Sequence, residues 1–328
     1  MTIAVLGAGS WGTTLADLLA RGGHEARLWG NERDDLAAIA AEGENRKFLP
    51  GIRLHEQVKV QPELEAALDG ADVVLFVVPS QAVRKVAARI GGRAPRALIV
   101  CASKGLELGS LMRMSEVLAE GLLRTEVVVL TGPSHAEEVS RGIPTTVVAA
   151  AHDQARARAA QTLFASPTFR VYTNDDVTGC EFGAALKNVV ALAAGVCDGL
   201  GFGDNTKAAL LTRGLVEIAR IGVAMGGRRE TFFGLTGMGD LIATAISRHS
   251  RNRGVGERIG RGEPLDHILG SMVMVAEGVH TARAARDLGA RLGIETPIAD
   301  QVCAMLFEGR DPRDAVGRLM TRDLKSET

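Results

Sequence analysis

A lysine with small, apolar neighbours is the first residue of this chain that points to chemistry. Lys187 lies in the run EFGAALKNVVA, and on a helix its closest neighbours would be Gly183, Ala184, Val190 and Ala191. None of them offers a counter-charge, so the ammonium should lose solvation and its pKa should fall toward the range of a general acid or base. The alternative is a lysine that extends from a core helix to solvent.

A second lysine and several polar groups follow apolar runs that resemble buried strands. Lys104, one of seven lysines, comes just after Ala97–Ala102, and Gly132-Pro133-Ser134-His135 comes just after Val127–Leu130. Ligands of parallel sheets bind outside the carboxyl ends of the strands, so we expect Lys104 to meet the substrate. An ordinary surface lysine is the alternative. His135 is an alternative acid or base, although a loop histidine is more often incidental.

The second half of the chain holds a compact group of anion-binding side chains. Ser250, Arg251 and Asn252 combine a hydroxyl, a guanidinium fork and an amide, which suits a phosphate dianion. Asp240, in Gly237-Met238-Gly239-Asp240, adds a carboxylate nearby in the chain, although it could simply cap a helix.

A glycine motif at the start of the chain predicts a dinucleotide site. Gly7-Ala8-Gly9-Ser10-Trp11-Gly12 follows the apolar run Thr2–Leu6 and precedes a helical stretch. In this context Gly7 permits a tight turn, Gly9 lets the backbone approach a pyrophosphate, and Gly12 lets helix and strand pack closely. A glycine turn without a ligand is the alternative.

The residues after the second predicted strand bear on the choice of cofactor. NAD sites usually place a carboxylate at the tip of this strand, but here Ala26–Trp29 is followed by Gly30 and Asn31. Arg33 could meet a 2′-phosphate, and Glu32 could reach the ribose hydroxyls. We therefore expect NADP(H) to be accepted beside NAD(H). A solvated loop arginine is the alternative for Arg33.

The elements that position these residues form two predicted domains. Short β-rich runs alternate with helical stretches up to Tyr172, and only helical patterns follow Glu181. The pattern predicts an α/β Rossmann-type doubly wound sheet over residues 1–178 and an all-α domain over residues 179–328. Most of the runs are continuously apolar, as in parallel strands buried on both faces. The predicted strands are Thr2–Leu6, Ala26–Trp29, Val58–Val60, Asp72–Val78, Ala97–Ala102, Val127–Leu130, Thr145–Ala149 and Phe169–Tyr172.

Composition excludes several classes of protein. At 328 residues the prior is two domains, and 46% hydrophobic with 23% charged residues excludes intrinsic disorder. A net charge of −1 argues against binding nucleic acid through a general basic surface. No apolar run approaches the roughly 20 residues of a membrane span, and no signal peptide or metal-binding spacing is visible. Four scattered cysteines predict buried thiols in a reducing cytoplasm.

Taken together, the motifs resemble those of the bacterial NAD(P)-dependent glycerol-3-phosphate dehydrogenases. The resemblance runs in order over nearly the whole chain. Its motifs are Gly7-Ala8-Gly9-Ser10-Trp11-Gly12, Ala102-Ser103-Lys104-Gly105, Gly132-Pro133-Ser134-His135-Ala136, Ala185-Leu186-Lys187-Asn188, Gly203-Asp204-Asn205-Thr206-Lys207-Ala208-Ala209-Leu210, Gly237-Met238-Gly239-Asp240-Leu241 and Ser250-Arg251-Asn252-Arg253.

The resemblance implies a reversible reaction between dihydroxyacetone phosphate and sn-glycerol 3-phosphate, which would supply glycerophospholipid synthesis. It also implies NADP(H) or NAD(H) as cofactor and a homodimer. Lys187 matches the proton donor and acceptor. The substrate contacts carried over by motif are Lys104, Gly132, Ser134, Asp240, Ser250, Arg251 and Asn252. The cofactor contacts are Ser10, Trp11, Arg33, Ala136, Val275 and Glu277, with Lys104 and Arg251 touching both ligands.

Two other functions stay open from the sequence. One is another enzyme that joins a Rossmann domain to a helical one, such as a 3-hydroxy-acid dehydrogenase or a ketopantoate reductase. The phosphate motif around Arg251 argues against it. The other is a non-catalytic NADPH sensor, which should have lost Lys104 or Lys187.

Overall fold

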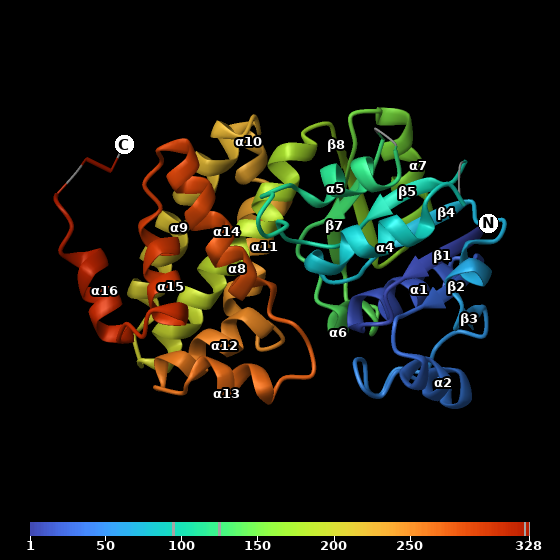
Figure 1. Ribbon diagram of the computed structural model, residues 1–328, viewed down its shortest axis with the longest axis horizontal. Coiled ribbons are helices and arrows are strands. Elements are labelled where there is room, and N and C mark those ends of the chain that lie inside the picture. Colours follow the sequence, from blue (N-terminus) through green and yellow to red (C-terminus); the bar gives the residue numbers. More distant parts are fainter. Residues whose placement is uncertain (94–95, 124–125, 325, 328) are drawn as a thin grey trace.

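The first half of the chain is a mixed sheet covered by helices. The computed structural model describes residues 1–93, 96–123, 126–324 and 326–327. Its sheet has eight strands in the order β3-β2-β1-β4-β5-β6-β7-β8 (Figure 1). The strands are β1 (Thr2–Leu6), β2 (Glu25–Trp29), β3 (Val58–Val60), β4 (Val73–Phe76), β5 (Leu98–Cys101), β6 (Val128–Thr131), β7 (Thr145–Ala150) and β8 (Phe169–Asn174). The predicted Rossmann-type sheet is confirmed.

The parallel pattern holds for the first six strands and changes at β7. β7 runs antiparallel to β6, and β8 is parallel to β7. Parallel neighbours need a long crossover, usually a helix, to carry the chain back across the sheet. The connection from β6 to β7 contains only the four-residue helix Ala136–Val139, so β7 starts from the same edge at which β6 ends.

Helices cover both faces of the sheet because successive side chains of a strand point to opposite faces. On β1, Ile3 and Val5 pack with α1 and α7, whereas Ala4 and Leu6 pack with α3, α4 and α5. The helices of this half are α1 (Ser10–Arg21), α2 (Arg33–Glu42), α3 (Leu64–Leu68), α4 (Val83–Ile90), α5 (Met114–Gly121), α6 (Ala136–Val139) and α7 (Gln154–Phe164).

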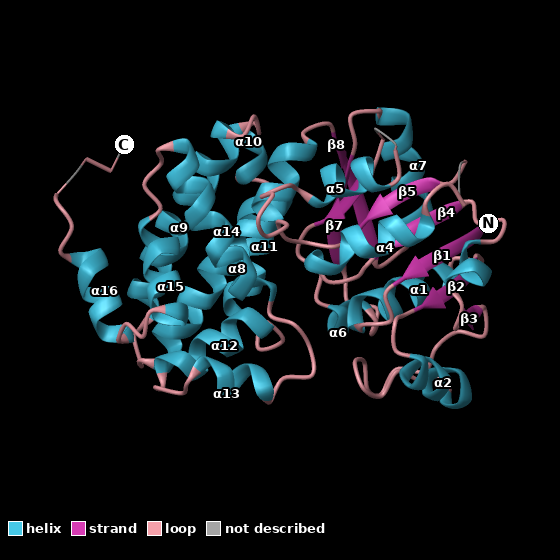
Figure 2. Ribbon diagram, viewed as in Figure 1, coloured by secondary structure: helices cyan, strands magenta, loops and turns pink. Residues whose placement is uncertain are grey.

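The second half is helical, as predicted, and is built around α8 (Figure 2). The helices are α8 (Val177–Gly199), α9 (Asp204–Ala224), α10 (Arg229–Phe232), α11 (Asp240–Ile246), α12 (Arg251–Gly260), α13 (Leu265–Gly270), α14 (Glu277–Leu292), α15 (Pro297–Phe307) and α16 (Pro312–Met320). A short π-helical turn, Leu235–Gly239, leads into α11. By length and composition alone α8 could cross a membrane, but its most apolar stretch is 100% buried inside the protein.

Glycines allow α8 and α12 to cross at unusually short range. A Cβ built on Gly195 would lie 2.0 Å from the carbonyl oxygen of Arg253, and one on Gly256 would lie 1.9 Å from that of Leu192. Gly199 and Gly260 face each other in the same way one turn further along. Since α8 carries Lys187 and α12 begins at Arg251, this close crossing sets how far apart those two side chains lie.

We expect Gly256→Ala to destabilise the protein, because its methyl group would overlap backbone of α8 that cannot move independently. Overpacking of this kind costs about 1–3 kcal/mol of unfolding free energy, which urea denaturation followed by circular dichroism would measure. Gly254→Ala, on the same helix, is the matched control, since its Cβ would meet nothing within 4 Å. Equal destabilisation by both substitutions would show that the close crossing does not limit stability.

Candidate active site

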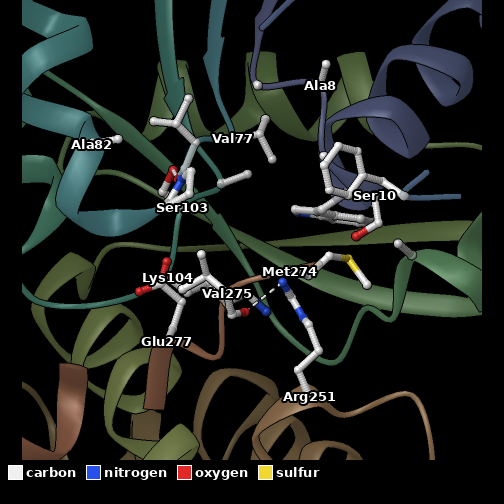
Figure 3. A pocket seen from close by; sticks show the side chains of 18 of the residues that line it. Ala8, Ser10, Val77, Ala82, Ser103, Lys104, Arg251, Met274, Val275 and Glu277 are labelled. Atoms are coloured by element: carbon white, nitrogen blue, oxygen red, sulfur yellow. Dashed lines mark hydrogen bonds between the residues drawn. The ribbon is translucent and has the colours of Figure 1, made fainter. Parts of the chain in front are cut away.

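A cavity of about 570 Å³ lies at the carboxyl edge of the sheet, where the helical half faces it. The lining comes from the loops after β1, β2, β4, β5 and β6 and from α4 in the sheet half, and from α8, α11, α12 and the segment before α14 in the helical half. Figure 3 shows Ala8, Val77 and Ser103 on one side of the cavity and Arg251 and Glu277 on the other. Most of the predicted site residues reach it. They are Gly7, Gly9, Ser10, Trp11, Lys104, Ser134, Ala136, Lys187, Asp240, Ser250, Arg251, Asn252, Val275 and Glu277.

The carboxylate of Asp240 lies between the two lysines. Lys187 donates from Nζ to Oδ1 of Asp240 at 2.5 Å, and Lys104 donates from Nζ to Oδ2 at 2.9 Å. Lys104 also donates to the carbonyl oxygen of Gly132 at 2.8 Å. The counter-charge that the Lys187 helix lacks is therefore supplied by α11. Asp240 opens α11 but uses its side chain to hold both ammonium groups, not to cap the helix.

Burial is the largest influence on the pKa values of Lys187 and Asp240. It lowers the pKa of Lys187 to about 8, helped by the positive charges of Lys104 and Arg251 and opposed by Asp240. For Asp240, burial works against ionisation, but the two ammonium groups outweigh it and hold the carboxyl pKa below its usual value. At neutral pH the site therefore holds an ionised carboxylate and a lysine that is close to releasing its proton.

Two residues at this centre were missed from the sequence. Lys187 also donates to Oγ1 of Thr244 at 2.6 Å, and Thr244 lies one helical turn after Asp240. That i, i+4 spacing was the available signal. The side chain of Asn188, next to Lys187 in the chain, accepts from Nδ2 of Asn252 at 2.9 Å and lines the cavity.

His135, the alternative acid or base, lines the cavity but is tied to the protein. Its Nε2 lies 3.3 Å from the carbonyl oxygen of Ala243, a contact that requires a proton on this nitrogen. Burial lowers the pKa of His135, so the neutral ring is favoured.

The anion-binding group gathers at the start of α12. Ser250 caps the helix, its Oγ accepting from the Arg253 amide at 3.2 Å. Nη1 of Arg251 donates to the carbonyl oxygen of Val275 at 2.9 Å, as drawn in Figure 3. Asn252 is fixed at both ends of its amide, since its Oδ1 also accepts from the backbone of Gly278 at 2.9 Å.

The glycine loop has the shape that a dinucleotide needs. Gly7 has φ +130°, and a Cβ there would lie 2.6 Å from the carbonyl oxygen of Val77. A Cβ on Gly12 would lie 1.8 Å from the carbonyl oxygen of Gly7, so Gly12 serves the packing of α1 and lies outside the cavity lining. A Cβ on Gly9 would meet no protein atom within 4 Å, which leaves its backbone open to a pyrophosphate.

Glu277 closes the cavity from the helical side. Its carboxylate accepts from the backbone amide of Ser80 at 2.9 Å and from the Ser80 hydroxyl at 2.5 Å. Val275, two residues earlier, lines the cavity beside Arg251.

Two other predicted residues do not line the cavity. Gly132 contributes its carbonyl group, which accepts from Lys104 and from the Ser134 hydroxyl at 2.9 Å, and its backbone packs closely against Val147. Arg33 donates to Glu63 at 2.5 Å and its side chain is 71% exposed. The structure therefore does not bring Arg33 to the cavity.

Comparison with known proteins identifies the family. Residues 2–157 match the model described as "NAD-dependent glycerol-3-phosphate dehydrogenase N-terminus", and residues 176–317 match the corresponding C-terminus model. The chain belongs to the NAD-dependent glycerol-3-phosphate dehydrogenase family. A relative named glycerol-3-phosphate dehydrogenase [NAD(P)+] from Moorella thermoacetica is 51% identical over 98% of this chain and 96% of its own.

Solved structures agree with this membership. The chain is similar to the crystal structure of glycerol-3-phosphate dehydrogenase from Coxiella burnetii, with 39% identity, a TM-score of 0.95 and 98% of each chain covered. A ketopantoate reductase from Ralstonia eutropha has 19% identity and a TM-score of 0.63, covering 96% of this chain and 100% of its own, and so shares the fold alone.

We expect Lys187 to titrate near pH 8 and its pKa to fall further in Asp240→Asn. The neutral amide no longer favours the ammonium, while burial and Lys104 still oppose it. Lysine side-chain NMR against pH would measure both values. Asp266→Asn, which removes an exposed carboxylate of α13 outside the cavity, is the control. An unchanged or raised pKa in Asp240→Asn would contradict the assigned pairing.

Proposed function

We propose that this chain catalyses the reversible NAD(P)H-dependent reduction of dihydroxyacetone phosphate to sn-glycerol 3-phosphate. The observation that carries the proposal is the buried Asp240 carboxylate, which holds Lys104 and Lys187 beside a phosphate-binding group and a glycine loop in one cavity. In this proposal residues 1–178 bind the cofactor and residues 179–328 supply most of the substrate site.

The proton chemistry belongs to Lys187. The bound nicotinamide cofactor supplies the hydride for the C2 carbonyl of the substrate. Lys187 donates a proton from Nζ to the carbonyl oxygen, and a pKa of about 8 leaves the lysine protonated at neutral pH yet able to give the proton up. Lys104, held by Asp240 and the Gly132 carbonyl, stabilises the negative charge that develops on that oxygen. In the oxidation direction the neutral Lys187 amine takes the hydroxyl proton.

The substrate phosphate does not react but positions the carbonyl. Arg251, Asn252 and Ser250 line the same cavity and supply donors for a phosphate dianion. Ser134 lines it as well, and its hydroxyl donates to the Gly132 carbonyl at 2.9 Å. Binding energy from this end of the substrate then lowers the barrier by orienting the carbon that receives the hydride.

A related enzyme with another substrate is the second candidate function. The ketopantoate reductase fold joins the same sheet half and helical half. The group of Ser250, Arg251 and Asn252 in this chain instead favours a phosphorylated substrate. NADPH oxidation with dihydroxyacetone phosphate, compared with unphosphorylated oxo-acids, separates the two functions. No oxidation with any of them, despite cofactor binding, would favour a sensor.

The cellular role follows from the product. sn-Glycerol 3-phosphate is the backbone of glycerophospholipids, so the reducing direction supplies their synthesis in the cytoplasm. A homodimer remains the expectation from the family resemblance.

Lys187→Ala should abolish turnover and leave cofactor binding nearly intact. Loss of a general acid costs on the order of 10²–10⁴ in rate, measurable as kcat from NADPH absorbance, while NADPH fluorescence reports binding. In the parent enzyme, reduction should slow as pH rises past about 8, because the ammonium is the acid. A mutant with a third of the parent kcat would exclude the catalytic role.

Arg251→Ala should raise KM for dihydroxyacetone phosphate and also lower kcat, because the phosphate would no longer orient the carbonyl. Arg251→Lys should recover only part of the loss, since an ammonium lacks the planar fork. Unphosphorylated dihydroxyacetone is the control: a poor substrate that the mutation should barely affect. Equal slowing of both substrates would place Arg251 in a structural or cofactor role.

A further inference from the structure

We propose that Lys85 and Arg89 of α4 form the binding site for the 2′-phosphate of NADP(H), so that this chain favours NADPH over NADH. The proposal rests on the proposed function only in that the dinucleotide occupies the glycine loop. It assigns to α4 the role that the sequence suggested for Arg33.

The position of the two cations is the first observation. Lys85 and Arg89 line the cavity together with Trp29, Gly30 and Asn31, which end β2. Lys104, which shares Asp240 with Lys187, follows β5, and β1 and β4 separate β5 from β2 in the sheet. The two cations therefore lie toward the β2 end of the cavity, away from Lys187. In Rossmann folds the adenosine ribose lies at the end of this strand. Lys85 and Arg89 are four residues apart on a helix and therefore share one face.

The guanidinium of Arg89 is held in place without being neutralised. Its central carbon lies 5.0 Å from the centroid of the Trp29 ring, a cation–π contact that leaves its N–H donors free to bind an anion. Among the described residues, neither Lys85 nor Arg89 has a carboxylate within ion-pair distance.

The acids at this end do not cancel the two cations. Asp35 is paired with Lys47 at 2.7 Å. Glu32 accepts from the Asn31 amide at 3.3 Å and has no cationic partner in the described ranges. Two cations therefore face one unpaired carboxylate. A 2′-phosphate meets net positive charge there, while Glu32 still offers an acceptor to the ribose hydroxyls of NADH.

Arg33 is the other candidate for binding the 2′-phosphate, and it differs from Arg89 in its ion pairing and in its position relative to the cavity. Its guanidinium is paired with Glu63, its side chain is 71% exposed, and it does not line the cavity. To reach a 2′-phosphate it would have to leave this partner.

The experiment compares ligands that differ only in the 2′-phosphate. Binding of 2′,5′-ADP and 5′-AMP by calorimetry, and of NADPH and NADH by fluorescence, is measured for the parent, Lys85→Ala, Arg89→Ala and the double variant. Lys59→Ala is the control, because it removes a cation of β3 outside the cavity. Arg33→Ala tests the competing residue.

The parent should bind 2′,5′-ADP more tightly than 5′-AMP. Loss of a charge-assisted hydrogen bond should weaken 2′,5′-ADP and NADPH about tenfold or more in Arg89→Ala and the double variant. Binding of 5′-AMP and NADH should stay within about twofold, the usual effect of a surface substitution. Lys59→Ala and Arg33→Ala should leave all four affinities within the same range.

Three results would overturn the proposal. Equal losses for NADPH and NADH in Arg89→Ala would mean that Arg89 stacks on the adenine instead. A selective loss of NADPH in Arg33→Ala would return the 2′-phosphate to that residue. A parent that binds 5′-AMP as tightly as 2′,5′-ADP would show that no such site exists. A parent that binds neither NADPH nor NADH would instead contradict the proposed function.

Discussion

The Asp240 carboxylate is the interaction on which the rest of the site depends. Its side chain is 2% exposed and touches one ammonium from the sheet half, Lys104, and one from α8, Lys187. A buried carboxylate is costly unless it is paired, and the buried Lys187 ammonium is costly for the same reason. Lys104, which is only partly buried, adds a second cation from the sheet half. Asp240 and Lys187 are therefore stabilised in the interior only when the loop after β5, α8 and α11 come together. The group that can carry out the proton transfer is also a group that fixes how the two halves meet.

Two further carboxylates of the helical half join it to the sheet half in the same way. Glu181 on α8 accepts from the Ser115 amide at 2.9 Å and from Arg113 at 2.8 Å. Glu277 at the start of α14 accepts from Ser80. Glu277 lines the cavity, whereas Glu181 and its partners lie outside the lining. Both contacts join the two halves through satisfied hydrogen bonds. Positioning of this kind lowers a barrier without any group having to move far during the reaction.

Local charge differs from net charge in this molecule. The chain carries a net charge of −1, yet its cavity is lined by Lys104, Lys187 and Arg251 from around the Asp240 site and by Lys85 and Arg89 of α4. Phosphorylated ligands respond to the potential inside the cavity, which a low-dielectric wall strengthens. The near-zero net charge argues against a general basic surface for nucleic acid, but it does not bear on the two proposed phosphate-binding positions inside the cavity.

The sequence by itself determined the order of elements, because apolar runs, helical periodicity and glycine punctuation are local. It also predicted the glycine loop, the two lysines and the Arg251 group, which stand in recognisable spacings. Only the tertiary structure decided which residues pair when they lie far apart in the chain. Asp240 looked like a possible helix cap, and its partners lie 53 and 136 residues away. The antiparallel β7 depends on a short connection, and the position of Arg33 on Glu63 depends on how α2 meets the start of α3. The sequence does not predict a binding role for Arg89, because nothing distinguishes it from other exposed helical arginines. Only the fold places its guanidinium over the ring of Trp29.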